Sequence, residues 1–188
     1  MTTLLETEIK QVMSNFIDLK IKTCERCNGP QDLAPMYHLV LDNDDIMAAI
    51  APIDKTPIEA LMETLPLVLF NQKPKFTMFM VEGYMKSSKS IREAKDHVKG
   101  SLEIDFKENA ATDVKETITV HGMDKSGTQV MGVVAFTYND FGVPVFEEPM
   151  FAEVVEEMME ANVPQIFALS YEYVKSALLS EYLKTITN

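Results

Sequence analysis

Residues 76–85, FTMFMVEGYM, decide the fold of this chain, because they predict a long strand that is apolar on both faces. Successive side chains of a strand point to opposite faces, so the even-numbered residues from Phe76 to Tyr84 share one face and the odd-numbered residues share the other. Glu82 is the single charged residue of the stretch. Two mostly apolar faces are typical of a strand in the middle of a sheet that is covered on both sides. We therefore predict a central strand over residues 76–85.

The residues before this strand predict a hairpin and a helix. Two short apolar runs, 36–41 and 46–50, are separated by the turn-forming residues 42–45, DNDD, which favours a β-hairpin. Residues 56–59, TPIE, combine an N-cap threonine, a proline at the first helical position and a capping-box glutamate. A helix should begin there. Pro66 lacks a backbone donor, so we expect this helix to kink or end at Pro66.

The N-terminal segment predicts a helix over residues 4–22. Thr3 and Glu6 have the capping-box spacing, and apolar residues then recur at helical intervals. Residues 24–35 contain an Asn-Gly-Pro sequence and a second proline, which favour turns. We expect a loop over residues 24–35.

After the central strand, the clearest pattern is a second hairpin. Residues 116–121 and 129–138 are rich in β-branched and aromatic residues, and a polar loop over 122–127 has glycine at both ends. Residues 90–100 begin with a capping box and end in glycine, which predicts a short helix. Alternating apolar residues within 101–114 are compatible with a further strand.

The C-terminal part predicts two helices. Residues 149–161 place apolar and acidic residues on opposite sides of a helical wheel, and a last helix should run over 165–186. The elements together predict an α+β fold: a largely antiparallel sheet of about five strands with an N-terminal helix, a central helix and two C-terminal helices. We expect a single domain over 1–188, because a boundary near 142–149 would leave about 40 residues, too few for a core.

Composition narrows the classes of function. The chain carries 29 Asp and Glu residues against 17 Lys and Arg residues, a formal net charge of −12. We expect no direct nucleic-acid binding, because affinity for the phosphate backbone comes from Lys and Arg. The longest strongly apolar run, 65–70, is too short to cross a membrane, and residues 1–6 lack the basic start of a signal peptide. These features predict a small protein of the cytoplasm with no membrane contact.

Cys24 and Cys27 are the only cysteines, too few for a secreted disulfide framework, and they favour a reducing cytoplasm. Their C-x-x-C spacing has three interpretations: two free thiols in a surface loop, a redox pair, or half of a zinc site. A redox pair belongs at the start of a helix, whereas this pair follows one. A zinc site would need His38 or a second subunit to complete its ligands. We expect free thiols, with no bound metal and no cofactor.

Glu82 is the most unusual residue of the predicted central strand, because a buried carboxylate must be paired, hydrogen-bonded or protonated. One interpretation places it near the strand end, in contact with solvent or a nearby lysine. The other makes it a general base or a ligand-orienting carboxylate, with Lys115, Glu116 or His121 as neighbours on an adjoining strand. These four residues are the candidate catalytic or ligand-binding residues.

The central strand and the strand after it also carry a sequence resemblance. Residues 81–85, VEGYM, followed by residues 113–118, DVKETI, and a later glycine at 127 resemble a group of uncharacterised phage and prokaryotic proteins. In that group a strand ends in an E-A-W-M-like motif and precedes a D-P-D-R-x-E-like motif. The matching positions here are Glu82, Tyr84, Asp113, Lys115 and Glu116. The resemblance implies a small phage-type or bacterial intracellular protein. It implies no particular activity, because the proteins of the group are uncharacterised.

The last predicted helix has two apolar stripes. One consists of Phe167, Tyr171, Val174, Leu178 and Tyr182, and the other of Ile166, Leu169, Tyr173 and Ala177. A helix on the surface of a monomer needs one stripe, so the second predicts contact with a partner. We expect a homo-oligomer through residues 165–186.

Three hypotheses of function follow from these patterns. The first is a non-catalytic, phage-related protein that acts by self-association or by binding a protein partner. The second is an enzyme or small-molecule binder with a carboxylate-centred pocket near Glu82. The third is an acidic inhibitor of a nucleic-acid enzyme.

Overall fold

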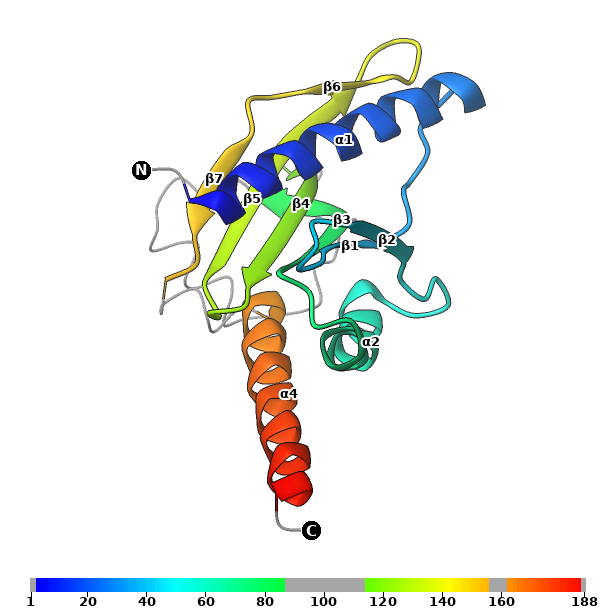
Figure 1. Ribbon diagram of the computed structural model, residues 1–188. Helices are drawn as coiled ribbons and strands as arrows, with labels where there is room; N and C mark the ends of the chain where they lie inside the picture. Colours follow the sequence, from blue (N-terminus) through cyan, green and yellow to red (C-terminus); the bar gives the residue numbers. More distant parts are fainter. Residues whose placement is uncertain (1–2, 87–113, 156–161, 187–188) are drawn as a thin grey trace.

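The computed structural model describes residues 3–86, 114–155 and 162–186, and within them three helices flank a seven-stranded sheet (Figure 1). The helices are α1 (Leu4–Cys27), α2 (Pro57–Gln72) and α4 (Asn162–Ile186). The strands are β1 (Met36–Val40), β2 (Ile46–Ile50), β3 (Phe76–Lys86), β4 (Val114–Asp124), β5 (Gln129–Tyr138), β6 (Pro144–Phe146) and β7 (Met150–Glu153). The α+β fold is confirmed, with two more strands than the five predicted.

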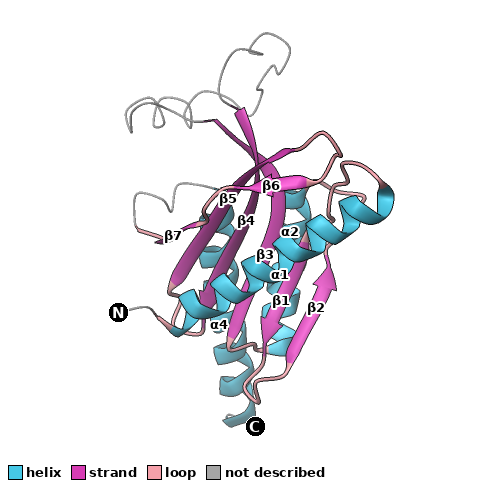
Figure 2. Cartoon of the chain, turned by 90° about the horizontal axis from the view of Figure 1, so that it is seen from above, coloured by secondary structure: helices cyan, strands magenta, loops and turns pink. Residues whose placement is uncertain are grey.

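Strand β3 lies in the middle of the sheet, as its two apolar faces predict. The strand order is β2-β1-β3-β4-β5-β6, β7 also pairs with β5, and all these pairs are antiparallel. Met78 and Met80 belong to a core beneath α1, whereas Phe79 belongs to a second core with α2 and α4. Figure 2 shows α1 on one side of the sheet and the other two helices behind it. Both predicted hairpins, β1–β2 and β4–β5, are confirmed.

Helix α1 continues beyond its predicted end at residue 22, so the prediction of a loop from residue 24 is wrong. The helix ends at Cys27, and its C-cap residue Asn28 adopts the left-handed conformation with φ 54° and ψ 44°. The Gly29 amide donates to the Cys24 carbonyl at 3.1 Å and closes the last turn. Asn and Gly at this point provide a helix C-cap, because both residues tolerate the left-handed backbone. The turn-forming residues therefore mark the end of the helix and not a loop that begins earlier.

Helix α2 begins as predicted and does not end at Pro66. The Thr56 side chain accepts from the Glu59 amide, and the Glu59 carboxylate accepts from the Thr56 amide at 3.0 Å. The helix runs through Pro66 to Gln72, with Leu65 and Leu69 buried on its inner side. Burial of this apolar face outweighs the loss of one backbone hydrogen bond.

The prediction of a helix over 149–161 is wrong for its first part. Residues Met150–Glu153 form β7, which pairs with Val130–Val133 of β5. Along its outer edge, β5 has backbone N–H and C=O groups that β6 leaves unpaired. Pairing with β7 satisfies these groups, although the sequence of residues 149–161 has a helical periodicity. Residues 156–161 lie outside the described part of the chain, as do the helix predicted over 90–100 and the alternating residues before β4.

Two glycines let α1 approach the sheet. A Cβ atom on Gly122 of β4 would lie 2.7 Å from Ile9 Cδ1 and 3.0 Å from Met78 Cγ. A Cβ atom on Gly132 of β5 would lie 3.3 Å from Ile9 Cγ2 and 2.8 Å from Phe151 Cε1. The fully buried side chain of Ile9 therefore occupies space that these two glycines leave open.

Replacing Gly122 with valine should destabilise the protein by about 1–3 kcal/mol, the usual cost of overpacking a core. The matched control is Gly83→Val on the neighbouring strand, where no atom lies within 4 Å of an added Cβ. The control should unfold at the denaturant concentration of the parent or slightly above it, since valine suits a strand. Equal midpoints for the two variants would show that α1 does not depend on this close approach.

Candidate functional site

Glu82 is held by groups from two other segments of the chain. Its side chain is largely buried on the α1 side of the sheet, and its Oε2 accepts a hydrogen bond from Lys20 Nζ of α1 at 2.6 Å. Its Oε1 accepts from the backbone amide of Leu33 at 3.0 Å. Both carboxylate oxygens therefore bind groups of the protein itself, and the contact joins α1, β3 and the segment between α1 and β1.

Lys20 has a completely buried side chain in this cluster. Its ammonium also donates to the Gln31 carbonyl, and it lies 5.2 Å from the ring centre of Phe136 and 5.7 Å from that of Tyr138. The two aromatic faces add a favourable cation–π contribution. Asp32 supplies a more distant, exposed carboxylate at 3.9 Å.

The electrostatics of the pair favour a charged lysine. Burial by itself lowers the pKa of Lys20, but the hydrogen bonds and charges of Glu82 and Tyr138 outweigh this effect and hold the pKa above its ordinary value. Burial raises the pKa of Glu82, and the Lys20 ammonium and the Leu33 amide oppose part of that rise. The arrangement is that of an ion pair that fixes the position of α1 on the sheet.

Sequence reasoning did not single out Lys20, although a signal was present. Phe16, Lys20 and Cys24 follow one another at intervals of four, so Lys20 continues the buried stripe of α1. A lysine on the apolar side of a helix needs a partner, because a buried unpaired charge is costly. Glu82, also on an apolar face, was the matching residue.

Lys115 and His121 are not gathered around Glu82, whereas Glu116 lies on the same face of the sheet, two residues from the position opposite Glu82. Glu82 faces Ile118 across the β3–β4 ladder, while Glu116 pairs with Tyr84 and His121 with Phe79. His121 therefore lies on the opposite face of the sheet from Glu82. Lys115 binds Glu147 at 2.5 Å.

His121 is enclosed between the sheet and α4. Its ring lies 4.7 Å from that of Phe167, and its Nε2 shares a hydrogen bond with Gln129 Oε1 at 2.7 Å. Its Nδ1 is buried and has no hydrogen-bond partner among the described residues. Burial lowers its pKa to about 4, and the contact with Gln129 counteracts only part of this.

The three candidate metal ligands are differently exposed. Cys24 is buried in α1, where its thiol lies 3.9 Å from the Gln31 carbonyl, and Cys27 is exposed at the end of the helix. The interpretation of both cysteines as surface-loop thiols is wrong in this respect, because the helix includes both. His38 lies on β1, and burial lowers its pKa. In the described parts of the chain, His, Cys, Asp and Glu side chains form no group of three that could hold a metal ion.

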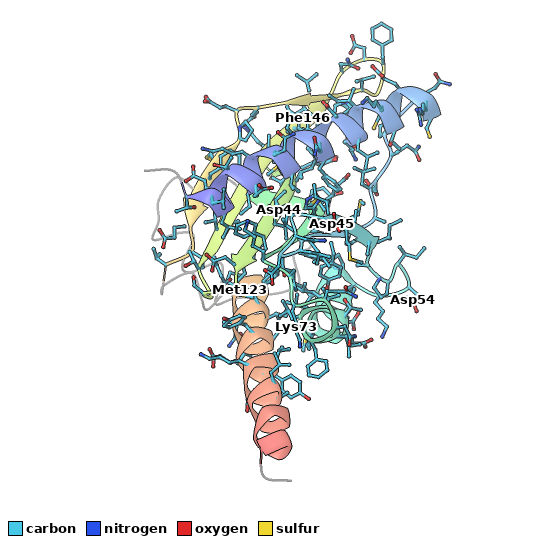
Figure 3. All side chains as sticks on the ribbon, viewed as in Figure 1. Asp44, Asp45, Asp54, Lys73, Met123 and Phe146 are labelled. Carbon is cyan, nitrogen blue, oxygen red and sulfur yellow. The ribbon has the colours of Figure 1, made fainter. Side chains whose placement is uncertain are left out.

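Two hollows open on the described surface. One of about 250 Å³ lies where α2 and α4 meet the sheet, and its lining residues include Met123 and Lys73, which Figure 3 labels. The other, of about 170 Å³, includes Glu82 and Tyr84. The larger hollow is therefore not the one beside Glu82.

Helix α4 has one packed face and one exposed apolar face. Phe167 and Val174 are buried against α2 and the sheet. Leu169 and Tyr173 are 64% and 68% exposed. The side chains from residue 179 onward, with Tyr182 of the first predicted stripe, lie outside the described part.

Comparison with known proteins gives no assignment: neither a family model, nor a curated protein, nor a solved structure matches this chain. None of the described helices is both long and apolar enough to cross a bilayer.

Proposed function

We propose that this protein is non-catalytic and acts by associating with further copies of itself through α4. The observation that carries the proposal is the exposed apolar stripe on this helix, centred on Leu169 and Tyr173. Ile166 and Ala177 continue the stripe with partly buried side chains. Large exposed apolar side chains that are grouped on one side of a helix favour contact with another protein surface.

The position of α4 suits an interface with a second copy. Figure 1 shows its C-terminal half extending beyond the sheet, away from α1. The N-terminal half packs against α2 and β4, through the face that contains Phe167 and Val174. Two α4 helices related by a twofold axis would each bring the same stripe to the contact, as an isologous interface requires.

The arrangement of Glu82 supports a structural role for this residue over a catalytic one. A general base needs a carboxylate that can reach a substrate proton, and both oxygens here are bound to Lys20 and Leu33. His121 lies on the opposite face of the sheet, and Lys115 forms an ion pair with Glu147. The pocket near Glu82 remains the alternative site of a small ligand, with Tyr84 at its edge.

The charge pattern also favours association over mimicry of a polyanion. Several acidic side chains of the described surface pair with lysines, so part of the negative charge is neutralised locally. These pairs are Glu6–Lys10, Glu63–Lys55, Asp44–Lys75, Glu147–Lys115 and Asp42–Lys125. Exposed pairs of this kind add little stability but suppress a strong single-sign field.

We place this activity in the cytoplasm, in a phage or prokaryotic setting. Cys24 and Cys27 are both free thiols, which suits a reducing compartment. The setting rests otherwise on the resemblance of residues 81–85 and 113–118 to phage-type proteins. Expression in bacteria followed by thiol counting in the purified protein should give two reduced cysteines.

Substitution of Tyr173 tests the proposed interface. Sedimentation equilibrium of the parent protein should give at least twice 21.2 kDa at micromolar concentration. Tyr173→Glu should lower that mass, because a charge would be buried in an apolar contact. The control is Lys175→Glu, a highly exposed position on another side of the same helix. A parent mass of 21.2 kDa, or a Tyr173→Glu mass equal to that of the parent, would contradict the proposal.

A further inference from the structure

Strand β2 is an unprotected edge of the sheet. Among the described residues it pairs with β1 alone, and all five of its residues are exposed. Ile46 and Ile50 are 63% and 65% exposed. Natural edge strands are usually blunted by charges, prolines or bulges, whereas this strand, IMAAI, has neither charge nor proline. The opposite side of the sheet is different, because β6 and β7 both pair along the outer edge of β5.

The hydrogen bonds beside β2 show which of its backbone groups point outward. The Leu41 amide donates to the Asp45 carbonyl at 2.9 Å, and the Ala51 amide donates to the Pro35 carbonyl at 2.8 Å. Hydrogen-bonding direction alternates along an antiparallel strand, so the odd-numbered residues of β2 bond to β1. The amides and carbonyls of Ile46, Ala48 and Ile50 therefore face away from β1, at the open edge.

We propose that β2 pairs antiparallel with β2 of a second copy about a twofold axis at Ala48. In that register Ile46 lies opposite Ile50 of the second copy, and Ala48 lies opposite its own equivalent. All three pairs consist of residues whose backbone groups point outward, so each pair exchanges two hydrogen bonds, about six in all. A twofold axis at Met47 or Ala49 would form only two such pairs within the strand, about four hydrogen bonds, and would not place Ile46 opposite Ile50.

The side chains of the strand fit the same symmetry. Val40 pairs with Ile46 and Met36 with Ile50 on the α1 side of the sheet, yet α1 packs over β3 to β6 and does not cover β2. Twofold pairing brings Ile46 and Ile50 of the two copies together on this uncovered face, where cross-strand apolar pairs stabilise a sheet. In either chain direction, β2 has an isoleucine at each end and an alanine at its centre. This symmetry favours a second copy of β2 over an unrelated peptide as the pairing strand.

The charges at the end of the strand do not oppose this contact. The turn between β1 and β2 contains three aspartates, and Figure 3 labels Asp44 and Asp45 there. Asp44 binds Lys75 at 3.0 Å, and Asp42 binds Lys125 at 2.6 Å. Two of the three acids are thus neutralised within their own chain, which limits repulsion between the copies.

Ala48→Lys is the direct test, because it would place two like charges opposite each other on the axis while leaving the bonds to β1 intact. Ile53→Lys is the control, since Ile53 is highly exposed but lies beyond the strand. With both the α4 and β2 interfaces present, the parent should sediment at about four times 21.2 kDa or more. Ala48→Lys should fall to about twice 21.2 kDa, and Ile53→Lys should keep the parent mass.

Combination with Tyr173→Glu separates this inference from the proposed function. Tyr173→Glu alone should leave a dimer joined through β2, and the double variant Ala48→Lys/Tyr173→Glu should be a monomer. If Ala48→Lys keeps the parent mass while Tyr173→Glu lowers it, the β2 interface is refuted and the α4 interface stands. If only Ala48→Lys lowers the mass, the α4 proposal fails and the β2 interface stands. Circular dichroism of each variant should match the parent, so that a change in mass reports association and not unfolding.

Discussion

Lys20→Met should destabilise the protein by about 3–5 kcal/mol, because it leaves the buried Glu82 carboxylate without its counter-charge. Methionine keeps most of the length of the lysine stem, so the loss reports the ammonium and not a large cavity. The Gln31 carbonyl would lose its donor in the same variant. Chemical denaturation at neutral pH measures the effect.

The double variant Lys20→Met/Glu82→Gln should recover a large part of that loss. A glutamine at position 82 is neutral, and its carbonyl can still accept from the Leu33 amide. For the same reason Glu82→Gln alone should be milder than Glu82→Ala, which leaves the buried Lys20 ammonium without its counter-charge and the Leu33 amide without its acceptor, at about 3–5 kcal/mol. A double variant as unstable as Lys20→Met alone would show that the ion pair is not the source of the effect.

Acidification should destabilise the protein between pH 6.5 and pH 4 through His121. Its pKa is about 4 in the folded protein and 6.5 in the unfolded chain, so the unfolded chain binds the proton first as the pH falls. The contribution of neutral His121 is complete above pH 6.5 and is lost as the pH falls towards 4. The difference of about 2.5 between the two pKa values corresponds to about 3 kcal/mol in the free energy of unfolding.

His121→Gln removes this titration and should flatten the pH profile of the free energy of unfolding over the same range. The comparison variant is His38→Gln, since burial also lowers the pKa of His38. It should retain most of the slope, because His38 is only half-buried on β1. Parallel profiles for the parent and His121→Gln would assign the acid sensitivity to other groups.

The core strands were predictable because each has its own local pattern. Residues 76–85 are apolar at both parities, and this pattern corresponds to a position inside the sheet where both faces are covered. The turn 42–45 and the capping box at Thr56 likewise depend on a few neighbouring residues, whereas the loop predicted over 122–127 begins only after Asp124, because Gly122 and Met123 pair with β5. These are local backbone preferences, and they can be predicted from a few adjacent residues of the sequence.

Strand β7 and the length of α1 were not predictable in the same way. Residues 150–153 have a helical periodicity, but the open edge of β5 offers hydrogen bonds that only the assembled sheet provides. The end of α1 depends on whether Asn28-Gly29 act as a helix cap or as a loop, and the burial of Cys24 favours the cap.

The same distinction between local pattern and tertiary contact applies to the candidate site. The sequence by itself determined that Glu82 is out of place on an apolar face and needs a partner, because burying a carboxylate costs free energy in any fold. Only the tertiary structure decided that the partner is Lys20, which is 62 residues away in the chain, and that His121 lies on the other side of the sheet. The register of β3 against β4 and the position of α1 over Gly122 set these neighbours. Such contacts form between segments whose separation in the sequence carries no information about their distance in space.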